Sequence, residues 1–266
     1  MKIAICELPD GMAHHGLAWD AFARRVERSR PDLTLLNEMP FGPWTARLAT
    51  FDPRLAAASI EAHESALTAL GALPGAVISS RPVRSGDKLA NEAFLLADQH
   101  YRPLHHKQYF PHEAGFFERE WFWADRIGFQ PFDFRGVRFG VLLCTELMFN
   151  ERARHYRRQG VHVILVPRAS GTARDLWHTA ARMAAIVSGC YVLSSNRVSP
   201  HADAMPRFGG SGFAYSPTGE LLHETSEAHP FATLDIDVDL VRHAQRGYPC
   251  YVRELGEDPA EINALT

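Results

Sequence analysis

Short apolar runs alternate with longer amphipathic segments along nearly the whole chain of 266 residues. The short runs have the length and aliphatic content of buried strands, whereas the longer segments repeat apolar residues at helical spacing. Strands are predicted at residues 2–8, 33–37, 76–79, 92–97, 137–144, 161–167 and 191–196. Helices are predicted at residues 17–29, 54–70, 151–159 and 175–188. Such alternation predicts an α/β fold in which helices cover the outer faces of sheets.

The chain is long enough for one large domain or two small ones. No internal repeat, low-complexity tract or linker-like change of composition divides it. We therefore expect a single domain over residues 1–266. The connection over residues 107–130 is unusually aromatic, and long loops inside compact domains tend to be functional, so we expect it to line or cover a site.

Charge and hydropathy exclude several classes of protein. The net charge of -3 and the isoelectric point near 6.5 argue against a nucleic-acid partner, whose phosphates require a basic face. Glu7 follows the first apolar residues too early for a signal peptide, and no apolar run approaches the roughly 20 residues of a membrane span. We expect a soluble, cytoplasmic protein without a membrane partner.

Cysteine and histidine spacing gives no sign of a metal. The four cysteines lie far apart without a CxxC pair, which argues against a zinc knuckle or a disulfide scaffold and fits a reducing compartment. Histidine is abundant, but the adjacent pairs at 14–15 and 105–106 would point in different directions on a strand, and no HxxxH or HExxH pattern occurs. We expect neither a metal nor another cofactor.

Three strand-like runs lead into chemically reactive side chains. The run over residues 137–144 ends in the thiol of Cys144 and then turns into a polar helix start. The run over 33–37 leads to the carboxylate of Glu38, and the run over 101–106 leads to the ammonium of Lys107. Alone, each residue type says little, because Cys is often buried and Lys and Glu usually lie on surfaces. Together at strand ends, they indicate catalysis.

The neighbours of all three residues resemble the nitrilase, or carbon-nitrogen hydrolase, superfamily, whose triad is Glu, Lys and Cys. Five ordered matches cover nearly the whole chain: 36–41 (LNEMPF); 106–111 (HKQYFP) with 115–119 (GFFER) and 121–122 (WF); 140–151 (GVLLCTELMFNE); 182 with 189–192 (GCYV) and 196–197 (NR); and 210–212 (GSG) with 216–220 (SPTGE). The second match is similar to the carbamoyl-amine amidohydrolases. Many relatives have Glu where this chain has Val187 and Arg where it has Met148. They also have Pro-Gly after the aromatic segment, where this chain has Ala-Asp-Arg at 124–126.

The resemblance implies a four-layer α-β-β-α sandwich that pairs into a homodimer or a higher homo-oligomer. It also implies catalytic roles for Cys144 as nucleophile, Glu38 as general base and Lys107 as the cation that stabilises an oxyanion. A second glutamate holds the lysine in this family. We assign that role to Glu118, which has the matching Phe-Phe-Glu-Arg context, although Glu113 and Glu120 are close competitors in sequence.

Five further residues are candidates for substrate binding. The backbone N–H of Thr145 is a second oxyanion donor by family analogy. Glu146 either meets substrate or simply favours a helix start through the macrodipole. Arg168 ends a buried strand and either receives a substrate carboxylate or forms a salt bridge with a neighbour such as Glu146. Trp44 and Trp177 either form pocket walls or pack in the core.

The resemblance predicts hydrolysis of a non-peptide carbon-nitrogen bond in a small amide or carbamoyl compound, through a cysteine acyl-enzyme. Nitrile hydrolysis at the same site is the alternative. Thr145 favours amides, because the nitrile-cleaving branch commonly has Trp directly after the nucleophile. A third hypothesis is a binding module with a silent site, against which the intact surroundings of Glu38, Lys107 and Cys144 argue.

Overall fold

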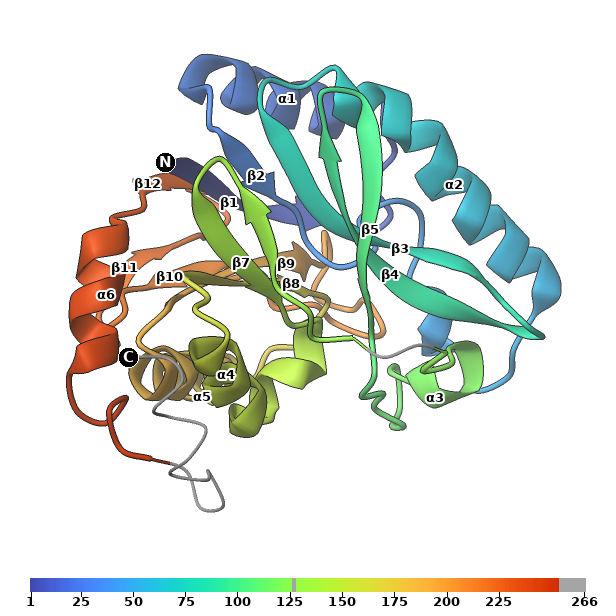
Figure 1. Cartoon of the computed structure of the whole chain (residues 1–266). Helices are drawn as coiled ribbons and strands as arrows, with labels where there is room; N and C mark the ends of the chain where they lie inside the picture. The colour runs from blue at the N-terminus through green and yellow to red at the C-terminus, as the bar shows by residue number, and fades with distance from the viewer. Residues whose placement is uncertain (126–127, 254–266) are drawn as a thin grey trace.

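Two layers of β-strands form the centre of the molecule (Figure 1). The computed structural model describes residues 1–125 and 128–253. The first layer contains β1 (Lys2–Pro9), β2 (Leu33–Leu35), β3 (Ala76–Ser85), β4 (Lys88–Ala97), β5 (His100–His106) and β12 (Phe231–Asp235). The second contains β6 (Phe132–Phe134), β7 (Val137–Val141), β8 (Val163–Arg168), β9 (Tyr191–Val198), β10 (Phe213–Tyr215) and β11 (Leu221–Glu224). Pairing of β1 with β9 connects the layers.

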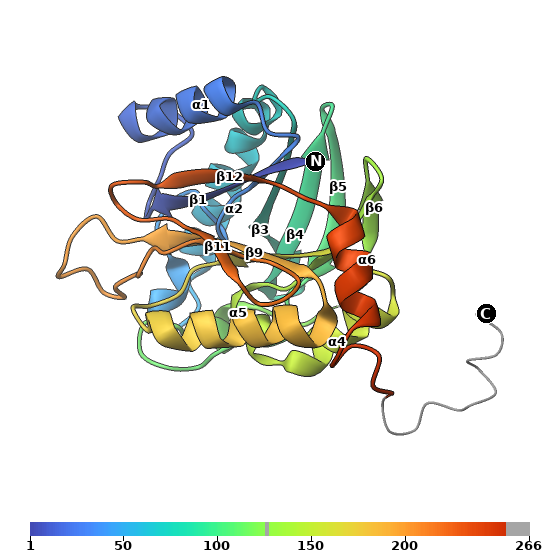
Figure 2. The same ribbon diagram turned by 90° about the vertical axis from the view of Figure 1, so that its left-hand side faces the viewer.

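Helices cover the outer faces of both layers, with α1 and α5 on opposite sides in Figure 2. The first layer carries α1 (Leu17–Ser29) and α2 (Pro53–Gly71), and the second carries α4 (Asn150–Arg158) and α5 (Arg174–Ser188). α6 (Val238–Arg246) closes one end of the apolar core between the layers through Val241. The predicted four-layer α-β-β-α sandwich is thus confirmed.

The side chains of β1 show why the central strands are almost continuously apolar. Ile3 and Ile5 face the core between the two strand layers, whereas Cys6 and Leu8 face α1 and α2. Successive side chains of a strand point to opposite faces, so a strand that is covered on both faces needs apolar residues at nearly every position.

Most predicted elements are present, with some ends in different places. α1 has the predicted bounds, and α2, α4 and α5 lie within one residue of them. The predicted strands 33–37 and 137–144 are too long, because the backbone leaves the sheet after Leu35 and Val141. β3 and β4 are longer than predicted because their hairpin extends until Ser85 pairs with Lys88. The sequence patterns did not predict β6, β10, β11, β12, α6 or the short α3 (Glu118–Trp121).

The strand directions bring distant residues to one edge of the sandwich. β1, β2 and β3 run parallel, and so do β7, β8 and β9. β5 runs antiparallel to β4, which runs antiparallel to β3, so β5 ends at the same edge as β2. Glu38, Lys107, Cys144 and Arg168 all lie at or just beyond these carboxyl ends.

Candidate active site

Cys144 lies at a sharp turn between β7 and the short 3-10 helix η2 (Cys144–Met148). Its backbone φ is 48°, in the left-handed region that few residues other than glycine adopt. Such strain concentrates at functional sites. The preceding strand is held by Tyr156 of α4, whose hydroxyl donates to the Val141 carbonyl (2.7 Å) and accepts from the Val141 N–H (3.2 Å). The turn therefore presents the thiol from a fixed support.

Glu38 lies in the loop after β2 and is completely buried. Its backbone N–H donates to the Arg168 carbonyl (3.1 Å), and its Oε1 accepts a hydrogen bond from the side-chain amide of Asn91 (2.7 Å). Arg197, which forms an ion pair with Asp10, also donates to the carbonyl of the following residue, Met39. The carboxylate is thus held from β4, and its backbone is held from β8 and β9.

Lys107 connects two carboxylates. Its Nζ lies 2.8 Å from Oε1 of Glu38 and 2.6 Å from Oε2 of Glu118, and all three side chains are buried. Burial alone would lower the pKa of Lys107, but attraction to Glu118 and Glu38 outweighs burial and raises it. The ammonium therefore stays charged.

Glu118 is the acid of the aromatic segment that reaches Lys107. Glu113 is exposed, and Glu120 is half-buried with its carboxylate 3.6 Å from His112. Burial and the negative charge of Glu38 raise the pKa of Glu118 to about 8, although Lys107 opposes the shift. Trp121 and Phe122 of the same segment pack in an apolar cluster with Met39, the residue after Glu38. Residues 126–127 of the predicted segment 107–130 lie outside the described residues.

The thiol of Cys144 is held in its neutral form by its surroundings. Burial raises its pKa, and the nearby carboxylates of Glu38 and Glu118 raise it further, whereas Lys107 and the backbone N–H of Ala169 lower it. A neutral thiol is a weak nucleophile, so attack requires a base at the moment of reaction. Glu38 is a carboxylate whose charge acts directly on this thiol.

Two oxygens of the cluster, Oε2 of Glu38 and Oε1 of Glu118, are buried without a hydrogen-bond partner among the described residues. Buried polar atoms are nearly always paired in native proteins. Unpaired carboxylate oxygens beside a thiol suit a molecule that brings N–H or O–H donors, such as an amide or a water.

Glu146, a candidate for substrate binding, forms hydrogen bonds within the protein. It is completely buried, and its Oε2 accepts hydrogen bonds from the Leu143 N–H and from Nε2 of His105, each at 2.7 Å. Its Oε1 accepts from the Gln108 N–H at 2.7 Å. The carboxylate therefore joins the residue before Cys144 to the residue after Lys107, and both of its oxygens are occupied by the protein.

Arg168 is buried and makes no salt bridge with Glu146 or with any other described acid. Its Nε donates to Ser194 Oγ (2.7 Å), its Nη1 to Ser170 Oγ (3.1 Å) and its Nη2 to the Ser211 carbonyl (2.5 Å). Burial lowers its pKa to about 10, which still leaves the guanidinium charged at neutral pH. The alternative of an ion pair with Glu146 is wrong.

The two predicted pocket tryptophans have different environments. Trp44 donates its indole N–H to the Gly115 carbonyl (3.0 Å) and packs against Phe116 and Phe208, as a core residue does. Trp177 lines a cavity of about 170 Å³, and the guanidinium carbon of Arg168 lies 5.1 Å from its ring centre. Thr145 is half-buried directly after Cys144, in the first turn of η2, where helical N–H groups have no acceptor within the helix.

Asn91 and His105 support the cluster through side-chain hydrogen bonds and were not predicted from the sequence. Asn91 carries a usable signal, because it is an uncharged polar residue between the apolar pairs Leu89-Ala90 and Ala93-Phe94, although the strand also contains Lys88 and Glu92. The sequence gives no such signal for His105, because the role of His105 depends on its contact with Glu146, which comes from the other strand layer. The Phe129 N–H donates to its Nδ1 (3.2 Å), so its proton lies on Nε2, facing the carboxylate.

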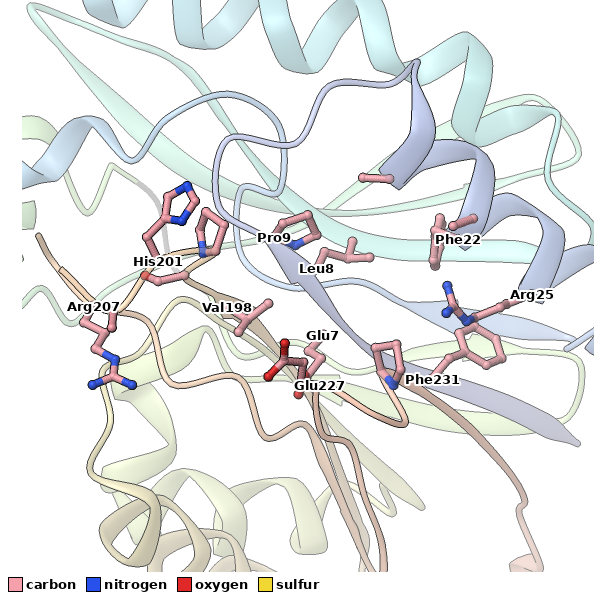
Figure 3. A pocket seen from close by; sticks show the side chains of 16 residues that line it. Glu7, Leu8, Pro9, Phe22, Arg25, Val198, His201, Arg207, Glu227 and Phe231 are labelled. Atoms are coloured by element: carbon pink, nitrogen blue, oxygen red, sulfur yellow. The ribbon is translucent and has the colours of Figure 1, made fainter. Parts of the chain in front are cut away.

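A second cavity, of about 450 Å³, lies at the ends of β1 and β9 (Figure 3). Its lining includes Leu8, Phe22, Val198 and Phe231, with Glu7 and Glu227 close together in the view. None of Glu38, Lys107, Glu118 and Cys144 lines it. Glu7 accepts hydrogen bonds from the Ser211 N–H (2.8 Å) and the Thr225 hydroxyl (2.9 Å), so it anchors the segment whose carbonyl receives Arg168.

Residues 1–125 and 128–253 contain no group of three His, Cys, Asp or Glu side chains arranged to hold a metal ion. No helix within these residues has the length and hydropathy needed to cross a membrane.

The sequence model for carbon-nitrogen hydrolases matches residues 12–246 of this chain. An N-carbamoylputrescine amidase from Solanum lycopersicum is 26% identical over 174 residues, which are 60% of this chain and 58% of the relative. A citrullinase from Francisella tularensis is 27% identical over 166 residues, 57% of this chain and 58% of the relative. The matched regions thus span less than two thirds of both curated relatives.

A solved structure of a carbon-nitrogen hydrolase from Helicobacter pylori G27 has the same fold. It superposes with a TM-score of 0.82 at 20% sequence identity, covering 100% of this chain and 98% of that one. At this level of identity the likeness concerns the fold alone.

Proposed function

The chain belongs to the carbon-nitrogen hydrolase family, and from this premise we propose that it hydrolyses the carbon-nitrogen bond of a small amide or carbamoyl compound. The observation that carries the proposal is the buried contact of Lys107 with Glu38 and Glu118 next to the Cys144 thiol. The names of the amidase and citrullinase relatives support carbamoyl groups among the substrates.

In the proposed first half-reaction, the sulfur of Cys144 attacks the carbonyl carbon while Glu38 accepts the thiol proton. Oε2 of Glu38 is suited to this step, because Oε1 already accepts hydrogen bonds from Asn91 and Lys107. The tetrahedral intermediate then collapses, its carbon-nitrogen bond breaks, and Glu38 returns the proton to the departing ammonia or amine. A thioester on Cys144 remains.

In the second half-reaction, Glu38 removes a proton from water, and the resulting oxygen nucleophile attacks the thioester. Collapse expels the thiolate, which regains its proton from Glu38, and releases the acid product. Lys107 and the Thr145 N–H stabilise the oxyanion in both halves. Glu118, in its ionised form, holds the Lys107 ammonium in place and offers Oε1 to the N–H of a substrate amide.

The proposal is tested by ammonia release from a panel of small amides, carbamoyl compounds and nitriles. We expect amides or carbamoyl compounds to be hydrolysed with higher kcat/KM than nitriles of the same side chain. A consistent advantage for the nitriles would replace the proposed reaction by nitrile hydrolysis.

The proposed nucleophile is tested by Cys144→Ala, with Cys250→Ala as a matched control. Cys144→Ala should fold normally and lose essentially all turnover, whereas Cys250→Ala should keep it, because Cys250 packs against α5 away from the cluster. Substoichiometric alkylation of the wild-type protein should modify Cys144 before Cys6, Cys190 or Cys250. Near-native turnover by Cys144→Ala would rule out the thioester mechanism.

A further inference from the structure

Arg168 is a buried cation that forms no ion pair with any acid in residues 1–125 or 128–253. Only 2% of its surface is exposed, and its three hydrogen bonds go to the neutral oxygens of Ser194, Ser170 and Ser211. A guanidinium has five N–H donors, so two of them have no acceptor in the part of the chain that the structure describes. Buried charges in proteins are normally paired, because removal from water is costly.

The acids near Arg168 are engaged elsewhere. Glu224, the carboxylate that acts on Arg168 through its charge, forms a bidentate pair with Arg174 at 2.6 and 2.5 Å. Glu146 is bonded to His105 and to two backbone N–H groups. The described acids therefore leave the positive charge of Arg168 unneutralised. An anion from outside the protein would provide the missing ion-pair partner.

The position of Arg168 links the catalytic cluster to a cavity. Its carbonyl accepts the Glu38 N–H, and the N–H of the next residue, Ala169, points at the Cys144 thiol. Its guanidinium lines the cavity of about 170 Å³ together with Trp177, His178 and residues 209–211. This cavity has space for roughly five or six non-hydrogen atoms at about 30 Å³ each.

We propose that Arg168 selects substrates whose acyl side ends in a carboxylate two or three carbons from the scissile carbonyl. This inference rests on the proposed function and names its substrate class. The carboxylate would accept the two available N–H groups of Arg168, and the short chain would pack against Trp177. Arg174 adds little attraction, because Glu224 already neutralises it.

The experiment compares three amides that share the scissile group: succinamate with a terminal carboxylate, butanamide with a methyl group and 4-aminobutanamide with an ammonium. For the wild-type protein, kcat/KM for succinamate should exceed that for butanamide by roughly ten- to hundredfold, as expected for charge-assisted hydrogen bonds. The ammonium compound should be the poorest of the three. Arg168→Met should abolish this ranking, and Arg168→Lys should keep part of it.

Arg182→Met on the exposed side of α5 removes the same charge and should leave the ranking unchanged. Equal losses for all three amides in Arg168→Met would make Arg168 a structural residue and overturn the inference. An absence of preference in the wild-type protein would do the same while leaving amide hydrolysis intact.

A second measurement requires neither turnover nor a folded variant. Propanoate should slow alkylation of wild-type Cys144 by iodoacetamide, whereas propylammonium at the same concentration should not. No difference between the two ions would overturn the inference. If none of the amides or carbamoyl compounds released ammonia, the proposed function would fail separately, and this protection would still decide whether Arg168 binds carboxylates.

Discussion

At the scale of single residues, the cluster combines groups whose charges depend on one another. Lys107 stays charged because Glu38 and Glu118 lie within 2.8 and 2.6 Å of its Nζ. Glu118 is harder to ionise because it is buried and lies near Glu38. Each acid also has one buried oxygen without a hydrogen-bond partner among the described residues, and the charges of both acids act on the Cys144 thiol. The chemistry therefore depends on this arrangement of charges and not on the thiol alone.

Glu118→Gln tests the dependence on charge, because the amide keeps the shape of the side chain but cannot balance Lys107. With a pKa of about 8, Glu118 becomes mostly ionised only above that pH, so the wild-type kcat should rise as pH increases through about 8. Glu118→Gln should lose this rise and fall below the wild type by roughly 100-fold at the plateau, the size typical of lost electrostatic stabilisation. Steady-state kinetics between pH 6 and about 9.5 measure both effects.

Glu113→Gln and Glu120→Gln serve as controls, since both carboxylates lie at or near the surface. They should keep the pH profile of the wild type. Damage at Glu113 equal to that at Glu118 would mean that the structure assigns the wrong acid to Lys107.

At the scale of elements, helix α2 supports the loop that carries Glu38. His63 of α2 accepts the Phe41 N–H through Nε2 (3.3 Å) and donates from Nδ1 to the Ser59 carbonyl (2.7 Å). This pattern requires a neutral imidazole, because a protonated Nε2 cannot accept. Burial lowers the pKa of His63 to about 4, in agreement with the neutral form. The helix and the loop are thus joined by a bond that acid disrupts.

His63→Gln should make stability less dependent on pH. Because the pKa of His63 is lower in the folded chain than the value of about 6.5 expected when unfolded, its contribution is complete above about pH 6.5 and is lost as pH falls toward 4. The wild type should therefore lose up to about 3 kcal/mol of unfolding free energy over this range through His63 alone. Urea unfolding at pH 7, 5.5 and 4.5 measures it. His100→Gln, at an exposed position, is the control, and equal slopes for both variants would contradict the assignment.

At the scale of the whole molecule, the site exists only because the two strand layers are held in register. Lys107 and Glu38 come from the first layer, and Cys144 comes from the second. Glu146 bridges them, since its carboxylate accepts from His105 of β5 and from the N–H groups of Gln108 and Leu143. Glu146 therefore helps to set the distance between the Lys107 ammonium and the Cys144 thiol, although it takes no part in the proposed reaction.

Glu146→Gln should loosen this junction. An amide has a single acceptor oxygen for the three donors now bound, so at least one buried donor loses its partner at a cost of about 1–3 kcal/mol. We expect a lower melting temperature and slower alkylation of Cys144, together with a reduced kcat. Glu151→Gln, at an exposed position at the start of α4, should change none of the three. Unchanged alkylation in Glu146→Gln would limit Glu146 to stabilising the fold.

The sequence by itself determined the alternation of strands and helices and the three residues at strand ends, because these signals are local. Apolar periodicity reports burial of each element, and Glu38, Lys107 and Cys144 each follow such a run. The short strands β6, β10 and β12 carry too few residues for a reliable period. Their positions are decided by pairing with distant strands.

Only the tertiary structure decided which polar side chains meet. Glu118 could not be separated from Glu113 and Glu120 by more than resemblance until packing brought it to Lys107. Glu146 and Arg168 were left with open alternatives, since a carboxylate and a guanidinium can pair with many neighbours. In the packed structure Glu146 pairs with His105, and Arg168 pairs with no acid among the described residues. Such contacts join residues far apart in the chain, so their distances depend on how both strand layers pack and not on any local pattern.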